Sequence, residues 1–210
     1  MNELKDKNGL TEAEFLSAYD PGKWERPSVT VDILLFCADR HSILLIKRGN
    51  HPFLGKWALP GGFVEPNESA ELAAARELFE ETNVKSSNLK QIGAFSNPKR
   101  DPRTRIITIA FLAICEHSPT ATAGDDAADA EYFTASVKNI SKEVLPEKII
   151  EQNVIFLDGS KHLEIVYKKE SLCSKYPTDQ KYTIIGETPL AGDHAEIIAK
   201  GLEFCQYVGN

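Results

Sequence analysis

Three glutamates, Glu77, Glu80 and Glu81, lie close together in the segment GGFVEPNESAELAAARELFEETNV, which runs from Gly61 to Val84. On an α-helix, residues three and four positions apart are neighbours, so these carboxylates would share one face. Like charges at this spacing repel each other and destabilise an isolated helix. A hard divalent cation would offset that repulsion, since Mg²⁺ prefers oxygen ligands and works together with substrate phosphates. The cluster therefore predicts a site for Mg²⁺ or Mn²⁺.

The residues around the glutamates favour a helix that packs on a sheet. Its apolar side, which we expect to face that sheet, contains Leu72, Ala75, Leu78 and Phe79. Small side chains near the acidic face would leave room for a metal and a phosphate; they belong to Ala70, Ala73 and Ala74.

Residues suited to capping stand at both ends of the predicted helix. Asn67 or Glu68 is expected at its N-terminus, where hydrogen-bond acceptors and negative charge are favourable. Asn83 follows the last turn, where a residue in the left-handed conformation often ends a helix. Arg76 is spaced to bridge to Glu80 on the next turn and to Glu68 two turns back, which would fix the carboxylates.

This segment resembles the signature of the Nudix hydrolases. That signature is Gly, five residues, Glu, seven residues, Arg-Glu, an aliphatic residue, any residue, Glu-Glu, any residue, Gly and an aliphatic residue. The chain departs from it at one position, because Asn83 stands where the family has glycine, and Asn tolerates a positive φ well. A solvated acidic helix face is the alternative interpretation, but the length of the motif favours the family. The matching residues are Gly62, Glu68, Arg76, Glu77, Leu78, Glu80, Glu81 and Val84.

The resemblance implies an α/β fold, a Nudix-type α/β/α sandwich with a mixed β-sheet. It implies hydrolysis of a nucleoside diphosphate linked to another group, with Glu77, Glu80 and Glu81 as metal ligands beside the carbonyl of Gly61 or Gly62. Arg76 belongs to the same catalytic signature.

The general base is less clear from the sequence. In some Nudix enzymes it is a signature glutamate, and in ADP-ribose pyrophosphatases it is often an acidic residue on a distal loop. The loop from Ser118 to Ala130 and the residue that follows it offer Asp125, Asp126 and Glu131 as candidates. The alternative is that this loop is only a solvated connection.

A basic segment, SNPKRDPRTR from Ser96 to Arg105, resembles the ADP-ribose pyrophosphatase branch, as does RPSVTVD from Arg26 to Asp32. Arginine offers forked donors suited to phosphate. Surface pairing with Asp101 is the alternative role for such arginines. We expect ADP-ribose as the substrate, with another nucleotide sugar or an oxidised nucleotide as alternatives. The candidate substrate-binding residues are Arg48, Arg100, Arg103 and Arg105.

The same branch includes transcriptional regulators, in which a Nudix-like domain senses ADP-ribose or a sugar and a C-terminal winged helix binds DNA. A winged helix would need roughly 60–80 further residues, whereas this sequence ends at Asn210, soon after its last predicted helix. The intact glutamates also favour catalysis. We therefore expect an enzyme, and a ligand-sensing regulator is the minor alternative.

Composition restricts the partners. The 210 residues carry a net charge of −7, which argues against binding to nucleic acid or to an anionic membrane. The N-terminus has no apolar signal core, so we expect a cytoplasmic protein. The four cysteines are far apart; Cys37 and Cys115 lie in apolar runs and are expected to be buried free thiols.

A length of 210 residues is enough for one domain or for a domain with an appendage. Residues 1–26 read as an N-terminal extension with a short capped helix, and residues 27–210 as a single Nudix domain. Segment 138–188 has no counterpart in the resemblance; it extends the sheet, covers the site or forms a homodimer interface. Residues 137–152 look partly helical, and Asp158-Gly159 predicts a hairpin. Strands are expected at 28–37, 42–48, 88–95, 106–116 and from 131, and a last helix at 193–207.

Overall fold

The computed structural model describes residues 3–86, 88–121, 127–174 and 180–205. In this part of the chain, ten strands form one mixed sheet in the order β10-β9-β8-β7-β2-β1-β6-β5, with β3 paired to β2 and β4 paired to β1. The helices are α1 (Glu12–Ala18), α2 (Ala70–Thr82) and α3 (His194–Cys205). The strands are β1 (Ser28–Cys37), β2 (Ser42–Arg48), β3 (Trp57–Ala58), β4 (Gly61–Phe63), β5 (Leu89–Phe95), β6 (Ile106–Cys115), β7 (Ala127–Val144), β8 (Lys148–Asp158), β9 (His162–Leu172) and β10 (Lys181–Ile184).

Strand β1 organises the sheet. It runs parallel to β6 over its whole length, from the pair Ser28 and Ile106 to the pair Cys37 and Cys115. Its other edge is shared, because β4 pairs with residues 30–32 and β2 pairs with residues 36–37. Strands β1 and β2 therefore diverge, and the segment that contains β3 and β4 fills the gap between them. The candidate site lies at this gap.

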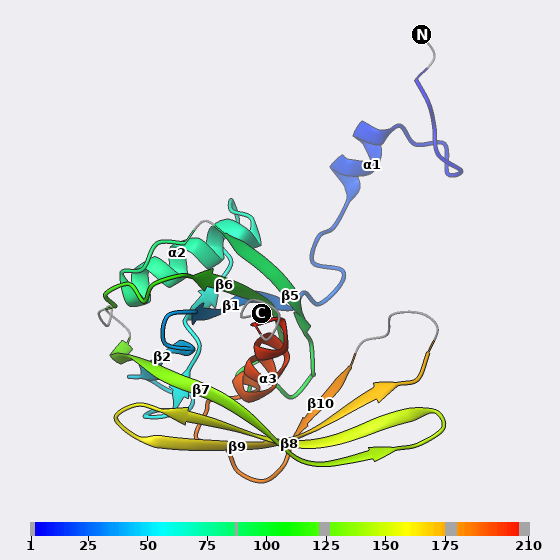
Figure 1. Ribbon diagram of the computed structural model, residues 1–210. Helices are drawn as coiled ribbons and strands as arrows, with labels where there is room; N and C mark the ends of the chain where they lie inside the picture. The colour runs from blue at the N-terminus through cyan, green and yellow to red at the C-terminus, as the bar shows by residue number, and fades with distance from the viewer. Residues whose placement is uncertain (1–2, 87, 122–126, 175–179, 206–210) are drawn as a thin grey trace.

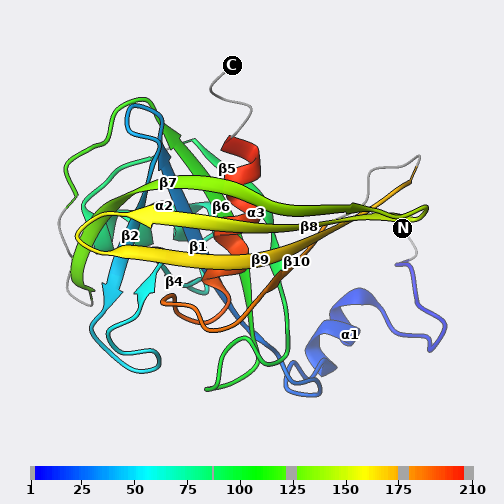
Figure 2. The ribbon, with the colours of Figure 1, turned by 60° about the horizontal axis from the view of Figure 1, so that its bottom comes forward.

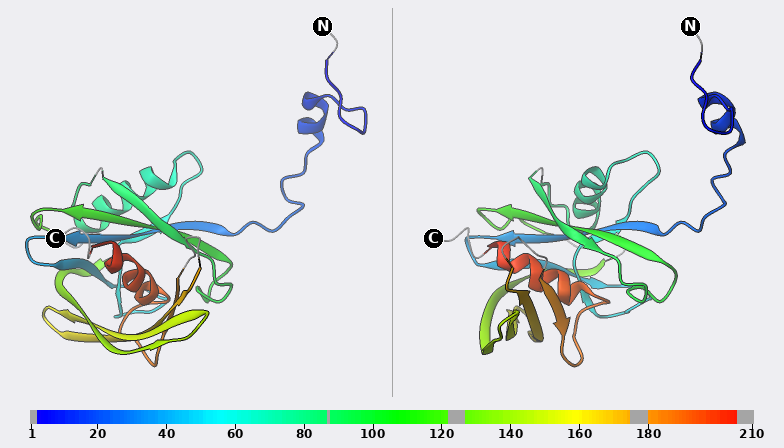
Figure 3. Two further views of the ribbon diagram at one scale, coloured as in Figure 1. Left: turned by 45° about the vertical axis from the view of Figure 1, so that its right-hand side comes forward. Right: turned by 90° about the vertical axis from the view of Figure 1, so that its right-hand side faces the viewer.

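Alternation along β1 creates two cores, since successive side chains point to opposite faces of a sheet. Val31, Ile33 and Leu35 pack with Leu78 of α2. The intervening residues Leu34 and Phe36 belong to the core that contains Ile197, Ile198 and Leu202 of α3. Figure 3 shows α2 and α3 on opposite faces of the sheet (see also Figure 1), which confirms the predicted α/β/α sandwich.

Helix α2 is rotated relative to the prediction. Leu72 and Phe79 are 62% and 40% exposed, whereas the buried residues are Ala73, Ala74, Leu78 and Thr82. The predicted apolar side was therefore wrong except at Leu78. The alanines permit a close approach to the sheet, and the rotation turns part of the acidic face inward instead of toward solvent.

Only the C-terminal end of α2 agrees with the prediction. Ser69, and not Asn67 or Glu68, is the N-cap, and its hydroxyl accepts a hydrogen bond from the backbone N–H of Leu72. Glu68 is engaged elsewhere, by Arg76. At the other end, Asn83 has φ 58° and ψ 18°, so the predicted left-handed conformation is confirmed.

The segment after residue 126 is more extended than the sequence suggested. The predicted partial helix at 137–152 is wrong, since β7 and β8 form a long antiparallel pair through this region and Pro146 lies in the turn between them. Burial alternates at Leu163, Ile165 and Tyr167 of β9, the period of a strand. The predicted hairpin at Asp158-Gly159 is confirmed. Figure 2 shows β7, β8, β9 and β10 as a long layer that extends the sheet.

The prediction of free thiols was wrong for two of the cysteines. Cys37 and Cys115 are register partners on the parallel strands β1 and β6, with Cα atoms 4.8 Å apart, and are joined as a disulfide. The two cysteines are 78 residues apart in the sequence, so their spacing did not indicate the pairing. Cys173 is an exposed free thiol and Cys205 is a buried one.

The N-terminal residues lie apart from the sandwich. Helix α1 buries no residue, and it stands away from the sheet in Figures 1 and 3. The predicted cap of this short helix is confirmed and is a capping box, because the side chains of Thr11 and Glu14 each accept from the other's backbone N–H. Within the described residues, no helix is long and apolar enough to cross a membrane.

The conformation of Asn83 predicts the effect of substitutions there. Asn83→Gly should leave stability unchanged or raise it slightly, because glycine adopts a positive φ without steric cost. Asn83→Val should lower the free energy of unfolding by about 1 kcal/mol or more, since a β-branched residue resists this conformation. Denaturant unfolding measures both, with Asn67→Val as the exposed control. Equal stabilities of the Val and Gly variants at position 83 would contradict the argument.

Candidate functional site

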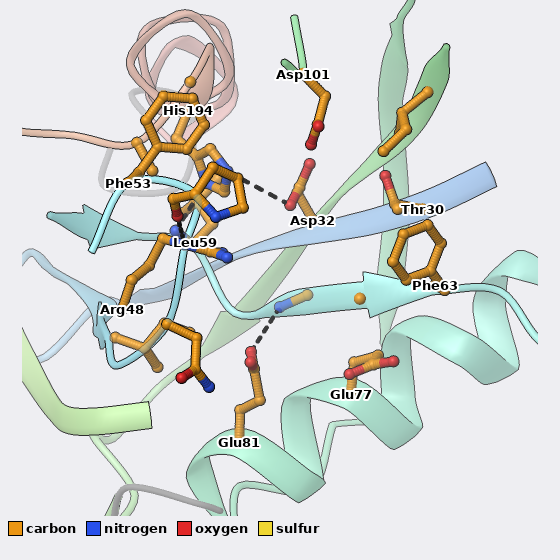
Figure 4. A pocket seen from close by; sticks show the side chains of 18 of the residues that line it. Thr30, Asp32, Arg48, Phe53, Leu59, Phe63, Glu77, Glu81, Asp101 and His194 are labelled. Atoms are coloured by element: carbon orange, nitrogen blue, oxygen red, sulfur yellow. Dashed lines mark hydrogen bonds and ion pairs between the residues drawn. The ribbon is translucent and has the colours of Figure 1, made fainter. Parts of the chain in front are cut away.

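A cavity of about 490 Å³ opens where β1 and β2 diverge. Its walls come from β1, β4, α2, the loop after β2, the loop before β6 and the N-terminus of α3. Figure 4 shows Glu77 and Glu81 on one side of β4, and Asp32 and His194 on the other. The fold thus brings together residues that are far apart in the sequence, such as Asp32 and His194, which are separated by 162 positions.

Glu81 is the most strongly perturbed acid of the cavity. Burial raises its pKa to about 8, although the backbone N–H of Gly61 donates to its Oε2 at 2.8 Å and opposes that rise. The negative charges of Glu77 and Asp32 raise the pKa further, while Arg48 lowers it. In the absence of a cation, Glu81 therefore favours its protonated form near neutral pH.

Glu77 lies directly against the glycine strand. Burial raises its pKa, although Arg76 opposes this by donating from Nη1 to Oε1 at 2.8 Å. A Cβ on Gly62 would collide with the Glu77 carboxylate, and a Cβ on Gly61 would collide with the carbonyl oxygen of Val31. The two glycines are required here for space, because the backbone of β4 passes so close to these groups.

Arg76 holds the acidic side chains in place. Its guanidinium contacts Glu68 at 2.6 Å and Glu80 at 2.9 Å, as the sequence predicted, and also Glu77. Its Nη2 also donates to the carbonyl oxygen of Phe63 at 3.0 Å, which ties α2 to β4. These contacts stabilise the charged guanidinium and raise the pKa of Arg76.

The three glutamates predicted to bind metal do not converge on one point. Glu77 and Glu81, one turn apart, line the cavity, whereas the side chain of Glu80 is 54% exposed and lies outside it. Glu80 is about 100° around the helix from Glu81, which explains the difference. Among the described residues, no three acidic, histidine or cysteine side chains form a compact metal-binding group.

The cavity nevertheless suits a hard cation. Glu77 and Glu81 supply partly buried carboxylate oxygens, and β4 brings Gly61 and Gly62 against them. Such oxygen-only donors suit Mg²⁺ or Mn²⁺. Burial is the main cause of the raised pKa of each carboxyl group, and a bound cation would stabilise the ionised form against it.

The predicted substrate arginines divide into two groups. Arg48 and Arg103 line the cavity; Arg48 Nε donates to the carbonyl oxygen of Pro52 at 2.8 Å, and Arg103 pairs with Asp101 while its side chain remains 46% exposed. Arg105 is outside the cavity and contacts the carbonyl oxygen of Ile106 at 3.3 Å. Of these three, only Arg48 and Arg103 are placed to meet a ligand.

Arg100 lines the cavity but is held by acids. Its side chain is only 7% exposed; Nε and Nη2 donate to both carboxylate oxygens of Asp193 at 2.9 and 2.8 Å, and Nη2 also contacts Asp32 Oδ2 at 3.3 Å. A bidentate pair of this kind fixes orientation. Arg100 therefore positions two carboxylates, which differs from the phosphate contact that its sequence context suggested.

Three cavity residues, Asp32, Asp193 and His194, were not assigned a role from the sequence. Asp32 carries a signal that could have been used, since a carboxylate in the apolar strand SVTVDILLFC is costly unless it is paired. Asp193 and His194 follow Gly192 at the start of the last helix and carry no comparable signal.

The candidates for a distal general base are not supported equally. Glu131 bonds the backbone N–H and the hydroxyl of Ser160, the latter at 2.6 Å, and it does not line the cavity. Its carboxylate is therefore used to hold the hairpin between β8 and β9. Asp125 and Asp126 lie outside the described residues, so their assignment stays a prediction.

Comparisons with known proteins agree with this geometry. The family model of the NUDIX domain matches residues 26–150. An ADP-ribose pyrophosphatase of Methanocaldococcus jannaschii is 41% identical over 134 residues, which are 63% of this chain and 76% of that protein. The ADPR responsive transcriptional repressor NtrR of Acinetobacter baylyi is 39% identical over 111 residues, 51% of this chain and 44% of that protein.

A solved structure extends the likeness to most of the chain. The MutT/nudix family protein from Enterococcus faecalis superposes with a TM-score of 0.69 at 35% identity, and the match covers 94% of this chain and 70% of that one. Together with the signature residues around Glu77 and Glu81 and the α/β/α sandwich that presents them, these matches show that the chain belongs to the NUDIX domain family.

Proposed function

We propose that this Nudix pyrophosphohydrolase cleaves the pyrophosphate bond of ADP-ribose in a reaction that depends on Mg²⁺ or Mn²⁺. The observation that carries the proposal is the pair of partly buried carboxyl groups, Glu77 and Glu81, which lie beside the glycine strand of the cavity. The 41% identity to an ADP-ribose pyrophosphatase supports the choice of substrate.

Each residue of the catalytic wall has a separate task. Nudix hydrolases generally use divalent metal ions, and a bound ion would neutralise the pyrophosphate and lower the pKa of a water molecule. Glu77 and Glu81, with the carbonyl of Gly61 or Gly62, are the proposed ligands. Arg76 orients Glu77 through its 2.8 Å contact. Glu80 has a place in the signature, but it would have to turn from Arg76 to reach the cavity.

The remaining charge of the diphosphate needs partners beyond the metal. Arg48 lines the cavity on the side of Glu81, and Arg103 lies over the ring of Phe63 with its guanidinium carbon 5.6 Å from the ring centre. Both can turn donors toward phosphate oxygens. We propose these two arginines as the phosphate contacts.

Two alternatives have support. Another nucleotide sugar or an oxidised nucleotide would use the same carboxylates. A ligand-sensing regulator is the other alternative, because the NtrR repressor is 39% identical over half of this chain. The presence of Glu77 and Glu81 in the cavity favours catalysis. Nanomolar, salt-sensitive binding of the chain to DNA, without turnover of any nucleotide, would favour the regulator.

Our remaining proposals concern location, domains and assembly. We propose a cytoplasmic location. We also propose that the protein binds neither nucleic acid nor anionic membranes, because its net charge of −7 would repel both. We keep residues 1–26 as an extension and residues 27–210 as one domain. We also propose a homodimer through the far end of the β7–β10 layer, where Ile140, Val144 and Leu172 are exposed. Sedimentation equilibrium tests the assembly.

Glu81→Gln should abolish most ADP-ribose hydrolysis. The amide keeps the shape of the side chain but loses the charge that a divalent cation requires, so kcat should fall by at least about a hundredfold, or more than about 2.7 kcal/mol of transition-state stabilisation. Steady-state rates with Mg²⁺ and with a chelator measure the effect, and Glu71→Gln on the exposed side of α2 is the control. Full activity of Glu81→Gln, or of the wild type in chelator, would contradict the metal assignment.

The raised pKa of Glu81 also predicts a pH dependence of stability in metal-free protein. In the unfolded chain, glutamate has a pKa of about 4.3, whereas in the fold Glu81 has a pKa of about 8. Between these values the folded state binds more protons, so stability falls as the pH rises from about 5 to about 8.

Glu81→Gln cannot ionise and should escape that loss. Its advantage over the wild type should grow with pH and reach roughly 1–3 kcal/mol near pH 9, less than the full shift because the cavity admits water. Thermal midpoints in chelator between pH 5 and 9 measure the difference. Parallel curves for the two proteins would contradict a raised pKa at this site.

Alanine variants of the three arginines before β6 should differ in whether they lose activity or stability. Arg103→Ala should lower kcat/KM for ADP-ribose about ten- to a hundredfold with little change in the thermal midpoint, the effect of a lost hydrogen bond to a charged group. Arg105→Ala should behave like the wild type, and Arg100→Ala should lower the thermal midpoint because it leaves Asp32 and Asp193 unpaired. Equal losses of kcat/KM for Arg103→Ala and Arg105→Ala would contradict the assignment.

A further inference from the structure

The wall of the cavity opposite the glutamates carries a second polar pair, Asp32 and His194. The side chain of Asp32 is 9% exposed and that of His194 is 12% exposed, and both line the cavity. Nε2 of His194 faces Oδ1 of Asp32 at 3.8 Å, as Figure 4 shows. This distance is longer than a hydrogen bond between nitrogen and oxygen.

Neighbouring groups determine which hydrogen-bonding atoms Asp32 and His194 present to the cavity. The backbone N–H of Leu59 donates to Nδ1 of His194 at 2.9 Å, so in the neutral ring the proton is on Nε2, which points toward Asp32. Arg100 contacts Oδ2 of Asp32 and is itself held by Asp193. The pair therefore offers one donor, Nε2–H, and one acceptor, Oδ1, to the cavity.

A hydroxyl group matches this arrangement. Its oxygen can accept from Nε2 at about 2.9 Å while its proton is donated to Oδ1 at about 2.7 Å, and one oxygen can satisfy both distances across the 3.8 Å gap. A phosphate oxygen cannot donate and would be repelled by Asp32. A cation would meet the Arg100 guanidinium, 3.3 Å from the same carboxylate.

The pair lies next to the proposed diphosphate site. The N–H of Gly61 bonds Glu81, and a Cβ on the same residue would be 2.9 Å from Oδ1 of Asp32. The two sites are thus separated by the width of one residue. A sugar attached to the diphosphate would reach the pair.

We propose that Asp32 and His194 bind a ribose hydroxyl of the nucleoside diphosphate substrate, and that Arg100 and Asp193 position Asp32 for this contact. The inference rests on the proposed function and extends it to sugar selection. A buried acid that must receive a hydroxyl proton also rejects a sugar that lacks that hydroxyl, because the acid is then left without its partner.

Two substitutions test the pair with little change of shape. In Asp32→Asn, the amide oxygen can stay on Arg100 while the amide nitrogen replaces the acceptor Oδ1. In His194→Asn, the side-chain oxygen can still accept from the N–H of Leu59, but the donor that faces Asp32 is lost. Asp39→Asn, in the turn after β1 and outside the cavity, is the matched control.

The readout is a panel of ADP-ribose and analogues that each lack one ribose hydroxyl. With Asp32→Asn, kcat/KM for ADP-ribose should fall about ten- to a hundredfold, and with His194→Asn about three- to tenfold. For the analogue that lacks the bound hydroxyl, wild type and both variants should agree within about threefold. A loss of equal size for every member of the panel would overturn the inference, as would no loss for any member.

The same panel separates this inference from the proposed function. Where the wild type hydrolyses no member of the panel, binding is measured by calorimetry in Mg²⁺ buffer on the wild type and on Asp32→Asn. If the wild type hydrolyses no member of the panel, the proposed hydrolysis fails, while selective weakening of the hydroxyl-bearing ligands by Asp32→Asn still supports the pair. If no member of the panel binds, the inference is overturned as well.

Discussion

The close approach of the glycine strand β4 to the partly buried carboxylates of Glu77 and Glu81 on α2 is the constraint on which the site depends. The backbone N–H of Gly61 donates to the Glu81 carboxylate. The Cα of Gly62 lies so close to the Glu77 carboxylate that a Cβ at this position would collide with it. Arg76 locks the two elements together through Glu77 and the carbonyl oxygen of Phe63. Two acidic side chains are thereby held in a partly desolvated wall, where a bound cation would stabilise the ionised form of each.

The divergence of β1 and β2 makes this approach possible. Because β1 shares one edge between β4 and β2, the cavity opens inside the sheet and receives side chains from both of its faces. Glu77 and Glu81 come from α2 on one face, and His194 comes from α3 on the other. The catalytic wall and the proposed hydroxyl site can then contact one ligand at the same time.

The signature predicted α2, its left-handed end at Asn83 and the Arg76 bridges, because these depend on local spacing. The buried side of α2 could not be predicted from periodicity, since Ala73 and Ala74 pack more closely than Leu72 does. The Asp32 and His194 pair and the role of Arg100 arise from contacts between distant segments. The local pattern of residues 137–152 suggested a partial helix, but pairing between β7 and β8 outweighed that signal.

The central claim, that Glu77 and Glu81 against β4 form the metal site, is tested most directly by Mn²⁺ titration of Gly62→Ala. The added Cβ would displace the Glu77 carboxylate, whose flexible end can move without unfolding the chain. The account predicts that Mn²⁺ affinity falls at least about tenfold, or about 1.4 kcal/mol, while the thermal midpoint in chelator stays close to that of the wild type. Unchanged Mn²⁺ affinity in folded Gly62→Ala would contradict it.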